Sequence, residues 1–188
     1  HSMGGAIAAL FLEEHPEYFD AAVLSSPMFS IKTGKTPKIA VSLLCAKIRL
    51  LHQEHLPFPG GKRFDGIPRF ESSSARSEVR YNYIFNQRLA DEHYHTYMMS
   101  NGWGAASFKA TRKILRNAYK VKIPVLLLTS GNDALVNMSG HKKFARRAAN
   151  VRHINFERAK HELYNDIDEV REEYFKTIFT FIMSYAVN

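Results

Sequence analysis

The chain opens with a serine between short residues, at the point where a helical pattern begins. Its first five residues are His1-Ser2-Met3-Gly4-Gly5. This spacing is typical of a nucleophile elbow, G-x-S-x-G, whose first glycine would lie just before residue 1. Such a turn pushes the serine hydroxyl toward a base. Gly4, with Gly5, is expected to let helix and strand approach, and the backbone N–H of Met3 should face a substrate carbonyl oxygen. The alternative is an ordinary helix start with Ser2 as its N-cap.

The apolar pattern that follows predicts an α/β fold. The first helix should end near His15-Pro16, because proline disfavours helix at the residue before it. Short apolar runs at residues 21–25 and 123–129 suit buried parallel strands, and residues 151–156 suit a strand nearer the sheet edge. Strand, elbow, helix and strand make a right-handed crossover, which is the unit of a parallel sheet flanked by helices.

The alternation of strands and helices is interrupted in the middle of the chain, which divides it into three segments. Residues 1–27 would form the elbow, helix and first strand of a core, and residues 120–188 its C-terminal part. Residues 28–119 are mostly helical by pattern, and we expect this insertion between two strands to form a lid over the site. Because the chain begins inside a motif, we expect it to be the C-terminal part of a larger protein. Helices are predicted at residues 37–51, 78–90, about 93–99, 105–119 and 139–149.

The last helix is predicted to begin in a polar stretch near residue 166. Asp166 and Glu169 stand in the relation of a capping box, and the apolar stripe behind them should pack on the sheet.

Two polar residues directly follow predicted strands. Asp133 ends the motif Ser130-Gly131-Asn132-Asp133, and His161 comes after the last strand. With Ser2 they give the chain order Ser, Asp, His of a catalytic triad. In a triad the histidine takes the proton of the serine, and the aspartate holds the imidazole in the correct tautomer. We therefore predict Ser2, Asp133 and His161 as catalytic residues, with the backbone N–H of Met3 as an oxyanion donor.

Other residues compete for these roles. Glu162 and Asp166 could also orient His161, but Asp133 is preferred because it follows a buried strand, whereas Asp166 is explained as a helix cap. The pair His93-x-His95 lacks nearby cysteine or carboxylate ligands at a zinc-binding spacing, so we predict no metal site.

Positive charge is concentrated in the predicted lid. The net charge of +8 favours an anionic partner. Lys47 and Arg49 alternate with apolar residues, and such an amphipathic basic stretch can lie on an acidic membrane surface; the alternative is a solvated charged face. Trp103, the only tryptophan, could line an acyl pocket or pack in a core. Cys45 has no cysteine partner in this chain, which favours a reducing compartment.

The three motifs resemble those of the lysophospholipase and monoacylglycerol lipase branch of the α/β-hydrolases. They are His1-Ser2-Met3-Gly4-Gly5, Ser130-Gly131-Asn132-Asp133 and Lys160-His161-Glu162-Leu163. The long basic lid, with Ser100-Asn101-Gly102-Trp103 near its end, is similar to that of bacterial inner-membrane lysophospholipases.

This resemblance implies the C-terminal part of an α/β-hydrolase fold with a helical lid. It also implies hydrolysis of the ester of a lysophospholipid or monoacylglycerol through an acyl-serine intermediate, without metal or cofactor. Lys47, Arg49 and Trp103 would then help to bind substrate. The protein would be cytoplasmic and peripherally associated with the inner membrane, with no nucleic-acid partner.

Two other functions stay open at this point. A serine aminopeptidase of the same fold would need acidic lid residues to hold the substrate amine, and the lid here is basic. A non-catalytic protein that binds acidic lipid would explain the net charge of +8, and it would not react with a fluorophosphonate.

Overall fold

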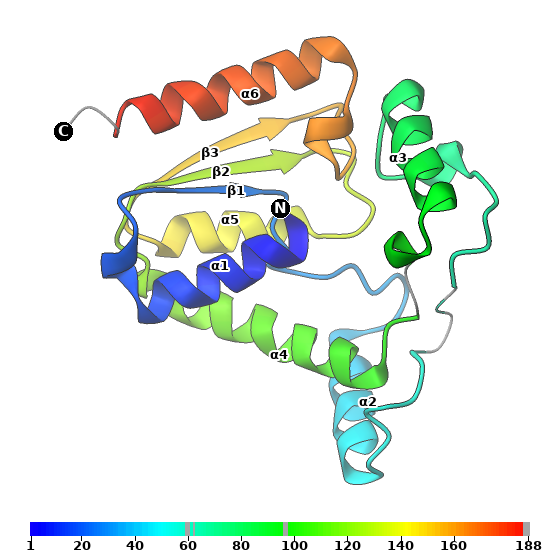
Figure 1. The fold of residues 1–188 in the computed structure, drawn as a ribbon. Helices are drawn as coiled ribbons and strands as arrows, with labels where there is room; N and C mark the ends of the chain where they lie inside the picture. The colour runs from blue at the N-terminus through cyan, green and yellow to red at the C-terminus, as the bar shows by residue number, and fades with distance from the viewer. Residues whose placement is uncertain (59–60, 62, 96–97, 186–188) are drawn as a thin grey trace.

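A three-stranded parallel sheet forms the centre of the molecule (Figure 1). The computed structural model describes residues 1–58, 61, 63–95 and 98–185. In the order β1-β2-β3, Ala22 of β1 pairs with Val125 of β2, and Val125 pairs with Val151 of β3. The three predicted strands are confirmed to within two residues. Their bounds are β1 (Ala22–Ser25), β2 (Val125–Ser130) and β3 (Val151–Phe156).

Helices cover both faces of this sheet, which confirms the predicted α/β class. Figure 1 shows α1 (Ser2–Glu14), α4 (Asn101–Asn117) and α5 (Met138–Arg147) on one face, and α6 (Asp168–Met183) on the other. Helix α1 ends just before Pro16, where the sequence predicts its end. Among the described residues, no helix combines the length and the apolar character needed to cross a bilayer.

The burial of both faces of β2 explains why its sequence is apolar without interruption. Val125 and Leu127 belong to the buried cluster beneath α1, α4 and α5. Leu126 and Leu128 belong to the cluster beneath α6. Because successive side chains of a strand point to opposite faces, a strand covered on both sides needs apolar residues at every position.

The segment predicted as a lid begins beyond the carboxyl ends of the strands. Helices α2 (Lys38–Leu50) and α3 (Glu78–Ala90) lie on this side of the sheet (Figure 1). A short 3₁₀ turn at Glu92–Tyr94 stands where part of a helix is predicted at about 93–99, of which residues 96–97 lie outside the described residues.

Helix α4 begins earlier than predicted and joins this segment to the core. Ser100 caps the helix, since its hydroxyl accepts a hydrogen bond from the backbone N–H of Trp103 at 3.1 Å. Near the other end, Ile114 is fully buried beside α1. The division of the chain at residues 27 and 119 stays a prediction.

Two local expectations are wrong. The capping box of Asp166 and Glu169 does not form, because α6 begins at Asp168, and the Asp166 carboxylate is fully buried and accepts from the N–H of Ile167 at 2.8 Å. Gly4 does not make the close approach, since a Cβ there would meet nothing within 4 Å beyond its neighbours and the backbone of its own helix. A Cβ at Gly5 would lie 2.8 Å from that of Pro27, so Gly5 makes it.

Candidate active site

Ser2 is at the very start of α1 and has an unusual backbone conformation. Its φ is 50°, a left-handed value that residues other than glycine seldom adopt. Its carbonyl oxygen accepts a hydrogen bond from the N–H of Met28 at 2.9 Å, which ties the start of α1 to the segment after β1. Ser2 is the first residue of the helix and not its N-cap, and its Oγ lies 2.9 Å from Nε2 of His161.

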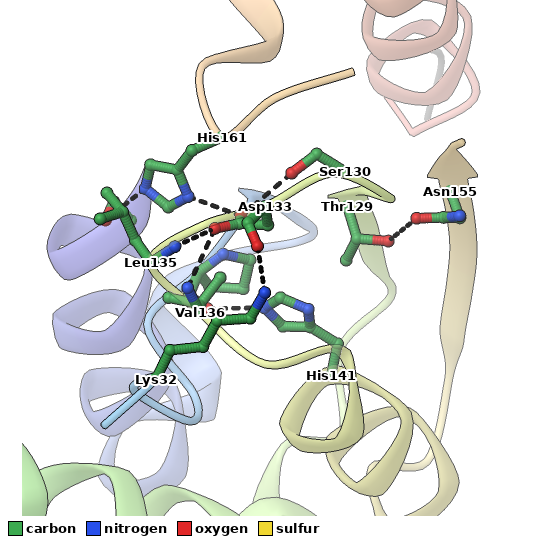
Figure 2. Close-up of polar contacts among 11 residues, drawn as sticks. Lys32, Thr129, Ser130, Asp133, Leu135, Val136, His141, Asn155 and His161 are labelled. Atoms are coloured by element: carbon green, nitrogen blue, oxygen red, sulfur yellow. Dashed lines mark hydrogen bonds and ion pairs between the residues drawn. The ribbon is translucent and has the colours of Figure 1, made fainter. Parts of the chain in front are cut away.

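Asp133 lies just beyond the carboxyl end of β2, where functional groups of open α/β sheets gather. Gly131 makes this turn possible, because a Cβ there would lie 2.1 Å from the carbonyl oxygen of Glu157. Oδ1 of Asp133 accepts from the backbone N–H groups of Leu135 and Val136, at 2.8 and 2.9 Å (Figure 2). These contacts fix the direction of the carboxylate.

His161 stands between Asp133 and Ser2, in the loop that follows β3. Its Nδ1 is 2.6 Å from Oδ2 of Asp133, and its Nε2 is 2.9 Å from Oγ of Ser2. An ionised carboxylate only accepts, so we assign the neutral ring's proton to Nδ1, which leaves Nε2 free to accept from the serine hydroxyl. Asp133 and His161 are 5% and 3% exposed, so bulk water hardly competes for their hydrogen bond.

The surroundings of Asp133 keep it ionised. Burial alone would raise its pKa, but the hydrogen bonds from His161 and from the backbone N–H groups of Val136 and Leu135 hold the pKa below its ordinary value. The carboxylate is therefore negative at neutral pH. It can stabilise a positive imidazolium when His161 accepts a proton.

Three further side chains support this arrangement (Figure 2). Lys32 donates to the backbone carbonyl of Asp133, and the hydroxyl of Ser130 donates to Oδ2 of Asp133 at 3.0 Å. Nε2 of the buried His141 donates to the carbonyl oxygen of Pro27 at 2.7 Å. Sequence reasoning missed their roles. Ser130 lies inside a recognised motif, but Lys32 is 101 positions from Asp133 and carries no local signal.

The remaining predicted residues lie in three places. Met3 is in the first turn of α1, whose N–H groups have no acceptor within the helix and lie at the positive end of its dipole. Trp103 lines a cavity of about 380 Å³ between α2 and α4, together with apolar residues such as Leu44 and Phe108. Lys47 and Arg49 are exposed in the last turn of α2.

Within the described part of the chain, no group of three or more His, Cys, Asp or Glu residues is gathered as metal ligands would be.

Curated relatives with similar sequences include viral and bacterial proteins. A protein named monoglyceride lipase homolog, from Monkeypox virus, is 29% identical over 185 residues, which cover 98% of this chain and 61% of the relative. Lysophospholipase L2 of Escherichia coli is 29% identical over 149 residues, which cover 77% of this chain and 42% of the relative. The chain thus spans about three fifths, or less, of the length of these relatives.

Solved structures show the same fold. A monoacylglycerol lipase of Paleococcus ferrophilus superposes with a TM-score of 0.74 at 22% identity, covering 99% of this chain and 67% of that one. A soluble variant of monoglyceride lipase from Saccharomyces cerevisiae superposes with a TM-score of 0.71 at 14% identity, covering 99% of this chain and 64% of that one.

Residues 1–168 match the family Hydrolase_4, described as "Serine aminopeptidase, S33". The match takes in the serine turn, the aspartate after β2 and the histidine after β3, so it covers every element that carries the candidate site. The chain therefore belongs to the Hydrolase_4 family of the α/β-hydrolases.

Proposed function

We propose that this chain forms the C-terminal part of a serine esterase that hydrolyses the acyl ester of lysophospholipids or monoacylglycerols. The observation that carries the proposal is the line of hydrogen bonds from Asp133 through His161 to Ser2, at 2.6 and 2.9 Å. A serine hydroxyl is a weak nucleophile until a base is in contact with it. The names of the relatives support a lipid ester as the substrate.

The reaction would follow from the direction of these bonds. Oγ of Ser2 attacks the ester carbonyl while Nε2 of His161 takes its proton, and Asp133 stabilises the imidazolium. The negative oxygen of the tetrahedral intermediate faces the N–H of Met3 at the start of α1. His161 then protonates the departing glycerol oxygen and leaves an acyl-serine. A water molecule, activated by the same histidine, releases the fatty acid.

The cavity beside Trp103 supports the proposal that the lid holds the acyl chain of the substrate. Its lining is mostly apolar and includes Ile31, Leu44, Phe58 and Phe108. Apolar pockets with few polar groups are typical of sites for such ligands. The proposal also takes residues 28–119 as the lid over the site.

The surface of α2 supports a peripheral contact with an acidic membrane. Ile39, Leu43 and Leu50 are 76%, 67% and 78% exposed, and the exposed Lys47 and Arg49 lie beside them. Apolar residues next to basic ones suit the boundary between lipid headgroups and acyl chains. We propose that the protein acts at the cytoplasmic face of the inner membrane.

Covalent labelling of the full-length protein tests the mechanism. A fluorophosphonate should label the wild type, and Ser2→Ala should abolish labelling and lower turnover of a lysophospholipid by about 10⁴-fold or more. Near-normal turnover in Ser2→Ala would refute the assignment. An unlabelled wild type that still bound acidic vesicles would favour the non-catalytic lipid-binding alternative.

The description of the family favours a second candidate, a serine aminopeptidase with the same three residues. Hydrolysis of a lysophospholipid and of a prolyl arylamide by the same preparation separates the two. Faster cleavage of the arylamide would replace the esterase proposal with the aminopeptidase one.

A further inference from the structure

One segment of the predicted lid lies directly along the loop that carries His161. We call residues 71–80 the strap and residues 159–168 the histidine loop. The N–H of Glu162 donates to the carbonyl of Ser74 at 3.0 Å, and the N–H of Ser77 donates to that of Asn165 at 3.1 Å. These two backbone bonds hold the strap and the histidine loop together on either side of Leu163.

A buried ion pair joins the same two segments. Nη1 of Arg76, in the strap, lies 3.3 Å from Oδ1 of Asp166, in the histidine loop. The Asp166 side chain is fully buried, and the Arg76 side chain is 25% exposed. Arg80 adds two contacts, since it donates to the backbone carbonyl of Asp166 at 2.9 Å and to the carboxylate of Asp168.

The histidine loop needs this cation because a buried carboxylate is costly without one. Burial raises the pKa of Asp166, and the N–H groups of Ile167 and Lys160 and the charge of Arg76 act against that rise. Lys160 directly precedes His161 in the chain. Without Arg76 the buried Asp166 carboxylate would either take up a proton or reach water, and reaching water would require the histidine loop to move.

His161 has little tolerance for such a movement. Its two hydrogen bonds, at 2.6 and 2.9 Å, require the imidazole to stay in line between two fixed groups. A displacement of about 1 Å in a reacting group can lower the rate by about 10²-fold.

We propose that Arg76 is a positioning residue for His161, acting through Asp166: the strap neutralises the buried carboxylate and so holds the histidine loop where the imidazole meets Ser2. This inference rests on the proposed function, because it takes His161 as the base of the reaction.

The test compares variants of the full-length protein on a short soluble ester, with kcat expressed per active site counted by fluorophosphonate titration. Arg76→Gln should lower kcat by roughly 10- to 100-fold, with KM changed by less than about 2-fold. Arg76→Lys should keep most of the activity because it keeps the charge. The double variant Arg76→Gln/Asp166→Asn should recover most of the loss because it leaves no unpaired buried charge.

Arg69→Gln is the matched control. Arg69 makes a close pair with Asp65 inside the predicted lid, at 2.6 Å, so its loss removes a lid arginine without touching Asp166. Its kcat should equal that of the wild type.

Equal kcat per active site in Arg76→Gln and the wild type would overturn the positioning role, even if the variant unfolds more easily. An equal loss in Arg69→Gln, or no recovery in the double variant, would do the same. If Arg76→Gln cannot be purified folded, Arg76→Lys and the double variant decide, since both should be active. Absence of labelling in the wild type would instead overturn the proposed function.

Discussion

Two buried carboxyl groups show how single residues are tuned in opposite directions. Asp133 and Glu13 are both 5% exposed. Asp133 accepts hydrogen bonds from His161 and from two backbone N–H groups, and its pKa lies below the ordinary value. Burial raises the pKa of Glu13 to about 7, although Asn117 and Lys113 act against the rise. The first environment suits a permanent negative charge, and the second opposes one.

Glu13→Gln should therefore stabilise the protein at alkaline pH. The native state keeps a proton on Glu13 up to about pH 7, whereas the unfolded chain loses it near the ordinary pKa of 4.5, so wild-type stability falls as pH rises between these values. A neutral glutamine avoids that loss, and we expect the free energy of unfolding to rise by roughly 3 kcal/mol at pH 8. Urea unfolding at pH 4 and pH 8 measures the difference, which should vanish at pH 4.

Glu14→Gln is the control for this measurement. Glu14 is the next residue of α1 and forms an exposed ion pair with Lys113. Its pKa is lowered by that partner, so its replacement should bring no gain at pH 8. A gain for Glu14→Gln, or the same gain for Glu13→Gln at both pH values, would contradict the explanation by burial.

At the scale of elements, β2 is the strand on which the rest of the core depends. It pairs with both neighbouring strands, and its side chains enter both buried clusters. The turn after β2 carries Asp133, so the packing of β2 and the position of the Asp133 carboxylate are linked.

Leu127→Ala should cost about 2–5 kcal/mol of stability, because Leu127 is fully buried beneath α1, α4 and α5 and its loss leaves a cavity. Chemical denaturation gives the value. Leu43→Ala makes the same chemical change on α2, where Leu43 is 67% exposed, and should change stability by about 0.5 kcal/mol or less. Comparable losses in the two variants would mean that α2 is packed far more tightly than its exposure indicates.

At the scale of the whole molecule, the candidate site lies on one side of the sheet, beyond the carboxyl ends of its strands. The carboxyl ends of the strands point toward the side where α3 lies (Figure 1). Asp133 and His161 follow β2 and β3 there, and the exposed apolar and basic residues of α2 belong to the same segment as the strap.

Replacing Lys47 and Arg49 together by glutamate should weaken binding of the full-length protein to vesicles rich in acidic phospholipid. The two charge reversals remove attraction worth about 1 kcal/mol per basic residue and add repulsion. Vesicle sedimentation measures binding, and turnover of a short soluble ester should stay unchanged. Lys142→Glu/Lys143→Glu, an equal change in exposed residues of α5, should bind as the wild type does. Equal weakening in both double variants would show that net charge, and not the α2 surface, governs association.

The parts of the candidate site that depend on local sequence signals could be predicted. Ser2 lies at an elbow, and Asp133 and His161 follow apolar runs, so chain order alone brings them to one end of a parallel sheet. Which carboxylate meets the histidine is a matter of side-chain direction. Glu162 and Asp166 are closer to His161 in sequence, yet Asp133 makes the contact.

The contacts between the strap and the histidine loop could not be predicted, because they join distant segments. Arg80 and Asp166 are 86 positions apart, and neither belongs to a periodic pattern that points to the other. Local spacing also predicts a capping box at Asp166, and this box does not form. Arg76 of the strap pairs with that buried carboxylate instead.

The sequence by itself determined the strands, most helix limits and the order of the candidate site residues, because these depend on hydrophobic periodicity and on turns made by neighbouring residues. Tertiary structure alone decided which carboxyl groups are buried with or without a cation, and how the strap lies against the histidine loop. The physical reason is that burial and pairing depend on which distant segments exclude water from the same volume, and no short stretch of sequence records that choice.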